Sequence, residues 1–290
     1  MQYDNPVTSA ALTESLSNAV SSSTLEAISS ILKLDKGVTS VEMAAGTVTP
    51  TNGKVSFESV EGFDSKTSKV VSLDIAGAAG EAVTLDVTKT KAKVIVLNSE
   101  ADVTVDGLKG GHKVVVAGNG NDTLVLKGVK NTVEGGAGND AITTKFGKDS
   151  LGGGEGNDSL NAGAGNDSIS GGAGNDTLVG GAGKDTFIWT DVAVGEVDQV
   201  QDAKGSKLDL SGLKLGDAAV ALKIGGAAVT ENKTAVGGTL DANNNIAFVD
   251  GNLVVDLNGD NTADFTIDIV GTNTIKGVVY NAKTDTFDLV

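Results

Sequence analysis

Residues 117–188 read AGNGNDTLV LKGVKNTVE GGAGNDAIT TKFGKDSLG GGEGNDSLN AGAGNDSIS GGAGNDTLV GGAGKDTFI, which is one nine-residue pattern repeated eight times. The second and fourth copies keep the fewest of the shared residues. A short fixed period predicts stacked copies of one small unit, because a chain built this way has no single globular core around one cleft. The rest of the chain is interpreted outward from this stretch.

Each position of the nonapeptide has a physical role. Positions 1, 2 and 4 are mostly Gly, which adopts the backbone angles of a tight turn without a steric penalty. Position 6 is an acidic residue in seven copies and Asn131 in the second, and position 8 is always large and apolar. Each copy is therefore expected to form a six-residue turn and a three-residue strand with one inward side chain. The position-8 residues are Leu124, Val133, Ile142, Leu151, Leu160, Ile169, Leu178 and Phe187.

Two copies are expected to make one coil, so that alternate loops stack on the same edge. One edge then carries Asp122, Asp140, Asp158 and Asp176, and the other carries Asn131, Asp149, Asp167 and Asp185. Stacked loops lie about 4.8 Å apart, so the carboxylates of a column repel one another unless a cation lies between them. A hard cation that accepts carboxylate and carbonyl oxygens suits such a column, and the chain has no Cys to offer a softer ligand. Calcium is the predicted ion.

The predicted ligands are the position-6 carboxylates and the backbone carbonyls of the loop residues before them. By loop they are Gly118, Gly120 and Asp122; Gly135, Gly136, Ala137, Gly138 and Asp140; Gly147 and Asp149; Gly153, Gly154, Glu155, Gly156 and Asp158; Gly163, Ala164, Gly165 and Asp167; Gly171, Gly172, Ala173, Gly174 and Asp176; and Gly180, Gly181, Ala182, Gly183 and Asp185.

The pattern GGxGxDxUx resembles the calcium-binding nonapeptide of RTX proteins. Four segments fit every fixed position: Gly135–Thr143, Gly153–Asn161, Gly171–Val179 and Gly180–Ile188. The resemblance implies an all-β parallel β-roll, several Ca²⁺ ions, export through a type I secretion apparatus, and folding that waits for calcium outside the cell. Two copies depart from the pattern, because 126–134 lacks the loop glycines and 144–152 keeps only Gly147 and Asp149.

The remaining chain is expected to divide around this tract. Residues 1–67 are predicted to form a region of two short helices, within 8–20 and 23–32, followed by strands on either side of a turn at 46–54. Residues 68–116 contain β-branched runs at a similar spacing, and this spacing predicts calcium-free coils of the same roll. The runs are 70–75, 83–87, 94–97, 103–105 and 114–116. Residues 117–188 form the calcium roll, and 189–290 form a β-rich capping module that includes a secretion signal. His112 is expected to be a turn residue rather than a ligand, since no second His or Cys accompanies it.

Two further groups of acidic residues lie after the repeats. The segment 197–213 resembles the one that follows RTX repeats in exported proteins, which implies that Asp198, Asp202 and Asp209 help to close the roll over a last calcium. In 256–264, Asp256, Asn258, Asp260 and Asp264 have the spacing of an EF-hand loop, but the sixth position is Asn261 instead of Gly and the twelfth is Ile267 instead of Glu. The sequence leaves open a weak calcium site and a plain Asx-rich turn. The end of the chain, 285–290, resembles the uncleaved C-terminal secretion signal of RTX proteins.

The composition limits the kinds of partner that the chain is expected to bind. The chain has 22 Lys and Arg against 38 Asp and Glu, a formal net charge of −16, so no nucleic-acid partner and no membrane insertion are expected. The absence of Cys fits an exported protein stabilised by calcium instead of disulfides. No cleavable signal peptide is evident in the first thirty residues, which fits export by the type I route. The predicted location is extracellular or at the cell surface.

No catalytic constellation is evident, so an enzyme is not expected. The single His excludes a His-Glu-x-x-His zinc site, and no Gly-x-Ser-x-Gly or P-loop motif is present. Three interpretations stay open. The first is a secreted structural protein that assembles with copies of itself into a surface layer, fibre or biofilm matrix. The second is an adhesin or the C-terminal piece of one, and the third is a small secreted effector.

Overall fold

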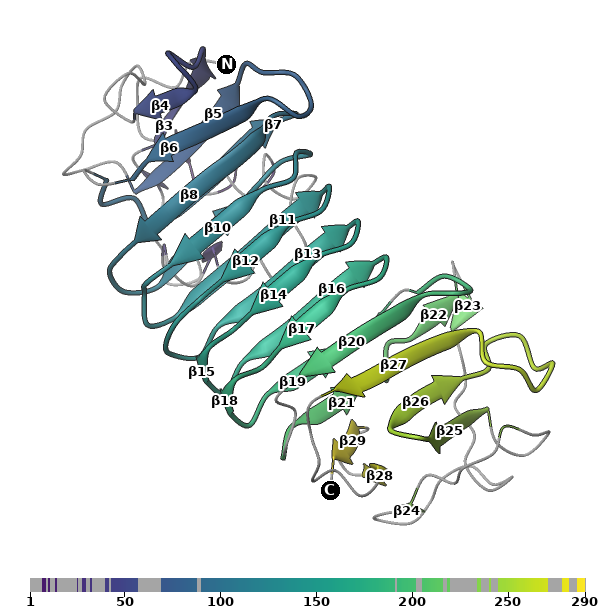
Figure 1. The fold of residues 1–290 in the computed structure, drawn as a ribbon. Coiled ribbons are helices and arrows are strands. Elements are labelled where there is room, and N and C mark those ends of the chain that lie inside the picture. The colour runs from purple at the N-terminus through teal and green to yellow at the C-terminus, as the bar shows by residue number, and fades with distance from the viewer. Residues whose placement is uncertain are drawn as a thin grey trace. The chain divides into compact units, whose positions relative to one another are not determined.

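The structure is a computed structural model, and the chain divides into two compact units, Met1–Leu151 and Gly152–Val290. The described residues are 7–8, 10, 14, 25, 28–29, 32, 40–41, 43–56, 69–87, 90–190, 192–201, 205–215, 218–219, 234–235, 240, 245–270, 278–281 and 286–289. Both units are built from β-strands, and each is described by itself below (Figure 1). The sequence predicts four regions, which begin at residues 1, 68, 117 and 189. The division of the structure into two units does not test these boundaries, and they stay a prediction.

In the first unit the chain winds between two parallel sheets, adding one strand to each sheet per coil. The first sheet has the order β12-β10-β8-β6-β4 and the second has the order β11-β9-β7-β5-β3. The strands of the first sheet are β4 (Lys54–Ser56), β6 (Ala82–Asp86), β8 (Asp102–Leu108), β10 (Thr123–Leu126) and β12 (Ala141–Thr143). Those of the second are β3 (Met43–Val48), β5 (Val70–Ile75), β7 (Val94–Ser99), β9 (Lys113–Val116) and β11 (Asn131–Ala137). A separate antiparallel pair joins β1 (Val7–Thr8) to β2 (Ser40–Val41).

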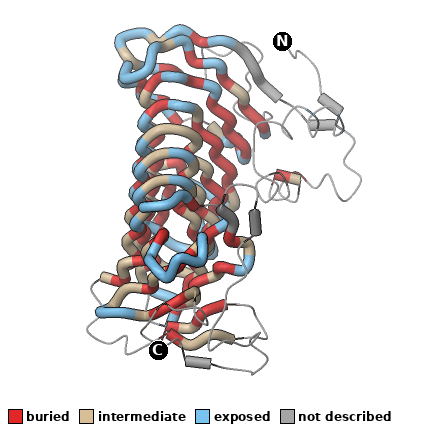
Figure 2. Tube along the Cα trace, turned by 90° about the vertical axis from the view of Figure 1, so that its right-hand side faces the viewer, coloured by how far each residue is buried: buried red, intermediate tan, exposed pale blue. Residues whose placement is uncertain are grey.

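The parallel β-roll expected from the nonapeptide is confirmed. Leu124 of β10 pairs with Ile142 of β12, one coil later, and both side chains are fully buried. All eight position-8 residues are buried, and Figure 2 shows buried positions recurring along the coils. Burying each of these side chains contributes about 1.5–3 kcal/mol, which makes the apolar ladders the main non-ionic source of stability.

The β-branched runs at 70–116 form coils of the same roll, as the sequence predicts. Their strands β5 to β9 pair in parallel, with Val70 opposite Val94 and Val94 opposite Val114. The roll also extends further toward the N-terminus, because β3 and β4 pair in parallel with β5 and β6. The expected turn is confirmed at Asn52-Gly53, where both residues have positive φ, but it is shorter than expected because 46–48 belong to β3.

The second unit also winds between two sheets, and its last strands run antiparallel. In its first sheet, β14 (Ser159–Asn161), β17 (Thr177–Val179), β20 (Val197–Gln201) and β27 (Phe265–Val270) pair in parallel, and β26 (Asn252–Val255) and β25 (Ile246–Val249) follow antiparallel. In its second sheet, β16 (Ser168–Ala173), β19 (Thr186–Ile188) and β21 (Lys207–Asp209) are parallel, and β29 (Thr286–Leu289), β28 (Val278–Asn281) and β24 (Thr234–Ala235) are antiparallel. The antiparallel strands are the β-rich module that the sequence predicts after the repeats. Five strands complete the list: β13 (Ser150–Glu155), where the two units divide, and the two-residue pairs β15 (Ala164–Gly165) with β18 (Ala182–Gly183) and β22 (Lys214–Leu215) with β23 (Ala218–Ala219).

Trp189, the only Trp of the chain, lies buried directly after the last nonapeptide. Its ring centroid is 6.3 Å from that of Phe265, on the parallel strand β27. Phe187, two residues earlier, is also fully buried. Buried aromatic side chains therefore close the C-terminal end of the repeats.

The two helices expected near the N-terminus fall mainly on residues outside the described ranges. Within those ranges, Ile28 and Leu32 are buried. A search of the described residues found no helix with the length and hydropathy needed to span a membrane.

Candidate metal centre

The glycines of the repeats bring successive loops into backbone contact. Gly172 and Gly174 have φ values of +113° and +121°, in a region that side chains other than Gly rarely adopt. A Cβ on either residue would also collide with a carbonyl oxygen of the loop one coil earlier, that of Gly154 or Gly156. Gly171 is restricted differently, since a Cβ there would collide with the Asp176 carboxylate. The loops therefore form a close-fitting cradle of carbonyl oxygens around each carboxylate.

Along the first edge of the second unit, each carboxylate binds the backbone of its neighbour. Asp176 Oδ1 accepts a hydrogen bond from the Asp158 amide at 2.8 Å, and Asp198 Oδ1 accepts one from the Asp176 amide at 2.9 Å. Asp158, Asp176 and Asp198 are all buried. Asp176 Oδ2 is buried as well, and no described residue donates a hydrogen bond to it. Asp176 Oδ1 thus links two successive coils, and Asp176 Oδ2 faces the loop without a hydrogen-bond donor.

The opposite edge of this unit repeats the arrangement. Asp185 Oδ1 accepts a hydrogen bond from the Asp167 amide at 2.9 Å, and Asp185 Oδ2 is buried with no donor among the described residues. The Asp185 amide donates to Ser206 Oγ at 3.0 Å, where a further carboxylate would be expected from the repeat. The column on this edge therefore ends in a hydroxyl.

The first unit has a similar arrangement on both of its edges. On one edge Asp140 Oδ1 accepts a hydrogen bond from the Asp122 amide at 2.7 Å, and Asp122 Oδ1 accepts one from the Val103 amide at 2.6 Å. On the other edge Asp149 Oδ1 accepts hydrogen bonds from the Asn131 amide at 2.6 Å and from Asn131 Nδ2 at 2.9 Å. The sequence-predicted stacking of loops eighteen residues apart is confirmed on both edges.

A lysine takes the place of the next carboxylate on this second edge. Lys113 lies opposite Asn131 in the ladder between β9 and β11. Its side chain is buried, and its ammonium group donates a hydrogen bond to the Ala92 carbonyl. The Lys113 ammonium group therefore occupies the ladder position at which the later coils carry a carboxylate.

Burial raises the pKa of the column carboxylates, because the charged form loses its hydration. The pKa of Asp122 and that of Asp176 rise to about 7, and those of Asp140 and Asp198 rise to about 6. Burial also raises the pKa of Asp149 and of Asp185. Buried carboxylates that are costly to ionise favour a compensating cation.

The donor set fits calcium. Every predicted ligand offers an oxygen, and oxygens are the ligands that hard divalent cations prefer. Among the described residues, no three His, Cys, Asp or Glu side chains converge into a cluster. The coordination shell would therefore be completed by loop carbonyls, which the glycine cradle brings close. Some of these carbonyls also join the coils, since Ala173 accepts a hydrogen bond from Gly156 and Gly163 accepts one from Ala182.

The acidic residues after the repeats have separate roles. Asp198 extends the first column, and its Oδ2 accepts a hydrogen bond from Trp189 Nε1 at 2.6 Å. Asp202 lies outside the described residues. Asp209 Oδ1 accepts hydrogen bonds from the amide and hydroxyl of Ser211, and a calcium role for Asp209 stays a prediction.

The segment 256–264 folds on itself. Asp256 accepts hydrogen bonds from the amides of Gly259 and Asn261, and Asp264 accepts them from the amides of Leu257 and Asn258. Asp260 is fully exposed at this loop, and its hydrogen bonds from the hydroxyl and amide of Thr262 lower its pKa. The backbone bonds of an Asx-rich turn are all present, and a calcium role for Asp256, Asn258, Asp260 and Asp264 stays a prediction.

Two contributors were missed by the sequence analysis. Ser206 completes the second column, and Glu196 Oε1 accepts a hydrogen bond from the Gly174 amide at 2.9 Å. Both lie beyond the last nonapeptide, where coils of 21 and 22 residues replace the eighteen-residue spacing. The available signal was one apolar residue in each of β20 and β21, Val200 and Leu208, which are buried and pair with Leu178 and Phe187 of the repeats.

Replacing Asp176 with Asn tests the assignment of the first column. Asp176 borders the loops of both Asp158 and Asp198, so the variant is expected to bind about one or two fewer calcium ions and to show a higher calcium midpoint. Isothermal titration calorimetry with metal analysis measures both quantities. Asp250→Asn is the matched control, because Asp250 is exposed and has a φ of 50° that Asn tolerates. An unchanged stoichiometry and midpoint in Asp176→Asn would reject this ligand assignment.

Comparison with known protein families supports the same interpretation. The chain matches the family described as RTX calcium-binding nonapeptide repeat (4 copies), once over residues 116–151 and again over 152–187. A comparison with curated proteins found no match. Repeats of this family bind Ca²⁺ at several sites. Residues 116–187 are therefore a tract of RTX calcium-binding nonapeptide repeats.

Proposed function

We propose that this chain is a secreted structural protein that folds when calcium binds outside the cell and then assembles with copies of itself. The observation that carries the proposal is the burial of ionisable carboxylates in every calcium loop, with Asp122 and Asp176 each raised to a pKa of about 7. A chain of net charge −16 repels itself when these groups are ionised and no cation is bound. Calcium binding and folding are then one event.

The same coupling supports export. In a calcium-poor cytosol the metal-free chain would stay unfolded and could pass through a type I secretion apparatus. Extracellular calcium modules bind at about 10⁻⁴–10⁻³ M, so the roll would fold after release. The C-terminal module would fold first and provide the template on which the coils are added. In this proposal the carboxylates have a structural role, and the chain is not an enzyme.

Self-assembly would use the sheets and the exposed loops of the roll. Parallel strands leave unpaired backbone groups wherever a sheet ends, and those groups can pair with another copy. A surface layer, a fibre or a biofilm matrix would be the product. The second candidate is a calcium-dependent adhesin, or the C-terminal piece of a larger one, which is favoured by four lysine-rich loops on one edge of the first unit.

Particle size distinguishes the two candidates. We expect the mass measured by light scattering and sedimentation to grow with protein concentration in millimolar calcium and to return to that of a monomer in chelator. Electron microscopy should then show ordered particles in the calcium sample only. A monodisperse monomer in calcium at every concentration would contradict self-assembly and would favour the adhesin.

A further inference from the structure

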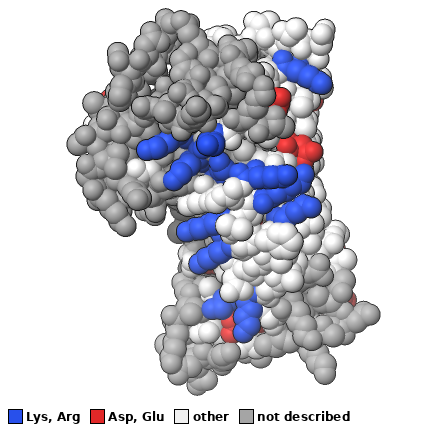
Figure 3. All heavy atoms as spheres, turned by 90° about the vertical axis from the view of Figure 1, so that its left-hand side faces the viewer, with Lys and Arg blue, Asp and Glu red and all other residues white. Residues whose placement is uncertain are grey.

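Exposed lysines are concentrated on one edge of the first unit. Four successive loops on this edge connect the first sheet to the second, and they lead into β7, β9, β11 and β13. We call the exposed lysines of these loops the lysine edge: Lys91, Lys93, Lys109, Lys127, Lys130, Lys145 and Lys148. Figure 3 shows lysines gathered in a band on this side of the molecule. The loops on the opposite edge of the same coils carry Glu81, Glu100, Asp102, Asp122 and Asp140 and no lysine.

The lysine edge has few compensating charges among the described residues. Among the described residues, only Lys127 forms an ion pair, with Asp106 at 3.3 Å. The one carboxylate that ends these loops, Asp149, is buried and binds Asn131. Lys93 of this edge also affects the adjacent buried Lys113, because burial and then the charge of Lys93 lower the pKa of Lys113. In a chain of net charge −16, such a cluster indicates a surface for an anionic partner.

The spacing of the loops favours a linear partner. Adjacent parallel strands lie about 4.8 Å apart, so each coil adds lysines at a constant interval along a straight row. Lys130 and Lys148 hold corresponding places in their loops, because each directly precedes a residue of the Asn131–Asp149 pair. A row of this kind presents cations to a chain of regularly spaced anions, and a pyranose unit is about as long as this interval.

Apolar side chains lie within the row. Val129 and Phe146 are each 62% exposed, and both belong to the lysine-bearing loops. The carbon–hydrogen face of a sugar ring packs against such side chains. Lys is the only cationic residue of the edge, whereas nucleic-acid recognition favours Arg and stacked aromatic rings.

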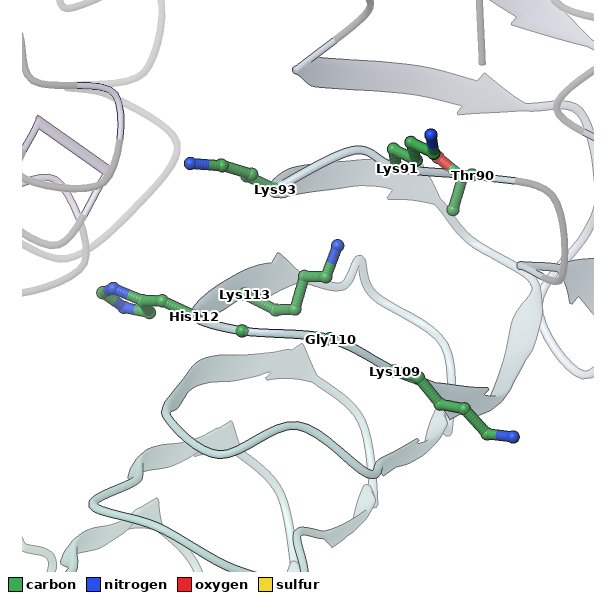
Figure 4. Close-up of a pocket in the computed structure, with 8 residues that line it drawn as sticks. Thr90, Lys91, Lys93, Lys109, Gly110, His112 and Lys113 are labelled. Atoms are coloured by element: carbon green, nitrogen blue, oxygen red, sulfur yellow. The ribbon is translucent and has the colours of Figure 1, made fainter. Parts of the chain in front are cut away.

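A pocket of about 340 Å³ lies at the end of the row nearest the calcium-free coils. It is lined by Thr90, Lys91, Lys93, Lys109, Gly110, Gly111, His112 and Lys113. In Figure 4, Lys93 and His112 point to the same side, and Lys113 points toward the preceding loop. Burial, followed by the charges of Lys130 and Lys93, lowers the pKa of His112. His112 Nε2 has no hydrogen-bond partner among the described residues. The pocket has the size and the lysine lining to receive one anionic group.

We propose that the lysine edge binds an acidic polysaccharide, with carboxylates of successive sugar units against successive loops and one sugar face against Phe146. Lys113 is a positioning residue, because its buried ammonium holds the Ala92 carbonyl and with it the loop that carries Lys91 and Lys93. The site needs the folded roll but does not need self-assembly.

Binding of oligogalacturonates tests the proposal on the full chain in saturating calcium. Oligomers of about six units are short enough to avoid gelling with calcium, and galactose oligomers of equal length provide the neutral comparison. We expect calorimetry to detect the acidic oligomer only, with an affinity that falls as salt rises. The triple variant K93Q/K130Q/K148Q should bind about 10-fold more weakly, as expected for the loss of three exposed ion pairs. Phe146→Ala should bind about threefold more weakly at every salt concentration.

Three controls separate the site from general charge and from misfolding. The control variant K54Q removes an exposed lysine at the start of β4, away from the lysine edge, and should bind within about twofold of the wild-type chain. The variant K93R/K130R/K148R keeps the charge and should retain binding. Each variant should keep the wild-type calcium midpoint by circular dichroism. Equal weakening by K54Q, or tighter binding to a single-stranded oligonucleotide or to anionic vesicles than to the oligogalacturonate, would overturn the proposal. Monomeric protein that still binds the oligomer would contradict self-assembly and leave this site standing.

Discussion

Chelation of calcium at pH 7.5 is expected to remove most of the strand signal from the circular dichroism spectrum. Without a cation, buried carboxylates such as Asp122 and Asp176 must either ionise in an apolar surrounding or take up protons against their pKa of about 7. The loss should be greatest in the nonapeptide coils. The earlier coils around Val70, Val94 and Val114 depend on apolar burial, so some residual strand signal is expected from them.

Trp189 provides a local measurement of the same event. It is the only Trp, it is buried, and its Nε1 binds Asp198 at the end of the first column. Its fluorescence emission should move to longer wavelength in chelator and return when calcium is added back. Magnesium at the same concentration should not restore it, since Mg²⁺ requires stricter octahedral geometry. If strand signal, emission and melting temperature were all unchanged in chelator, calcium-coupled folding would be rejected.

Acidification is expected to have opposite effects on the metal-free and calcium-loaded protein. In the metal-free chain the folded-state pKa of Asp122 and of Asp176 is about 7, and that of Asp140 and of Asp198 is about 6, all above the ordinary Asp value. The folded state therefore binds more protons than the unfolded state between about pH 4 and pH 7. Its stability is greatest below this range and falls as the pH rises through it. Each pKa unit corresponds to about 1.4 kcal/mol, so even one of these groups can change the stability by an appreciable part of the roughly 5–15 kcal/mol typical of a domain.

The measurement compares strand signal and melting temperature at pH 5 and pH 7.5 in chelator and in calcium. Lowering the pH should restore structure in chelator, and it should raise the calcium midpoint because protons compete for the same oxygens. General relief of charge repulsion could also stabilise the chain at pH 5. The double variant D122N/D176N separates the two causes, because it should be more stable than wild type in chelator at pH 7.5 and less sensitive to pH. D74N/D250N, at exposed positions, should behave like wild type.

The repeats made the fold and most of the candidate metal centre predictable from sequence. The nine-residue period placed Leu124 and Ile142 in the core and placed Asp158 and Asp176 on one edge, since a strict register leaves one arrangement of glycine turns and apolar strands. The β-branched runs before the repeats were also sufficient to locate β5 to β9. These predictions depend on local pattern alone.

Features outside the strict register could not be predicted. Ser206 ends the second column only because a longer coil brings it to the Asp185 amide, and no nonapeptide marks that position. The place of Lys113 opposite Asn131 depends on how strands of unequal coils pair, which sequence spacing alone does not determine. The lysine edge could not be predicted from the sequence for the same reason. Its members are scattered over 91–148 in the chain and become neighbours only when the coils stack.

The alternation of nonapeptides between two edges limits how such a protein can change its length. Successive loops on one edge are eighteen residues apart, which is two nonapeptides. Inserting or deleting one nonapeptide would transfer every later loop to the opposite edge and exchange the sheets to which the later strands belong. An even number keeps each strand opposite its former neighbour and each carboxylate above its former partner. Natural duplication and deliberate redesign of this tract should therefore add or delete nonapeptides in even numbers. Changes by an odd number should be lost in evolution, because they separate the capping strands from the coil that they complete.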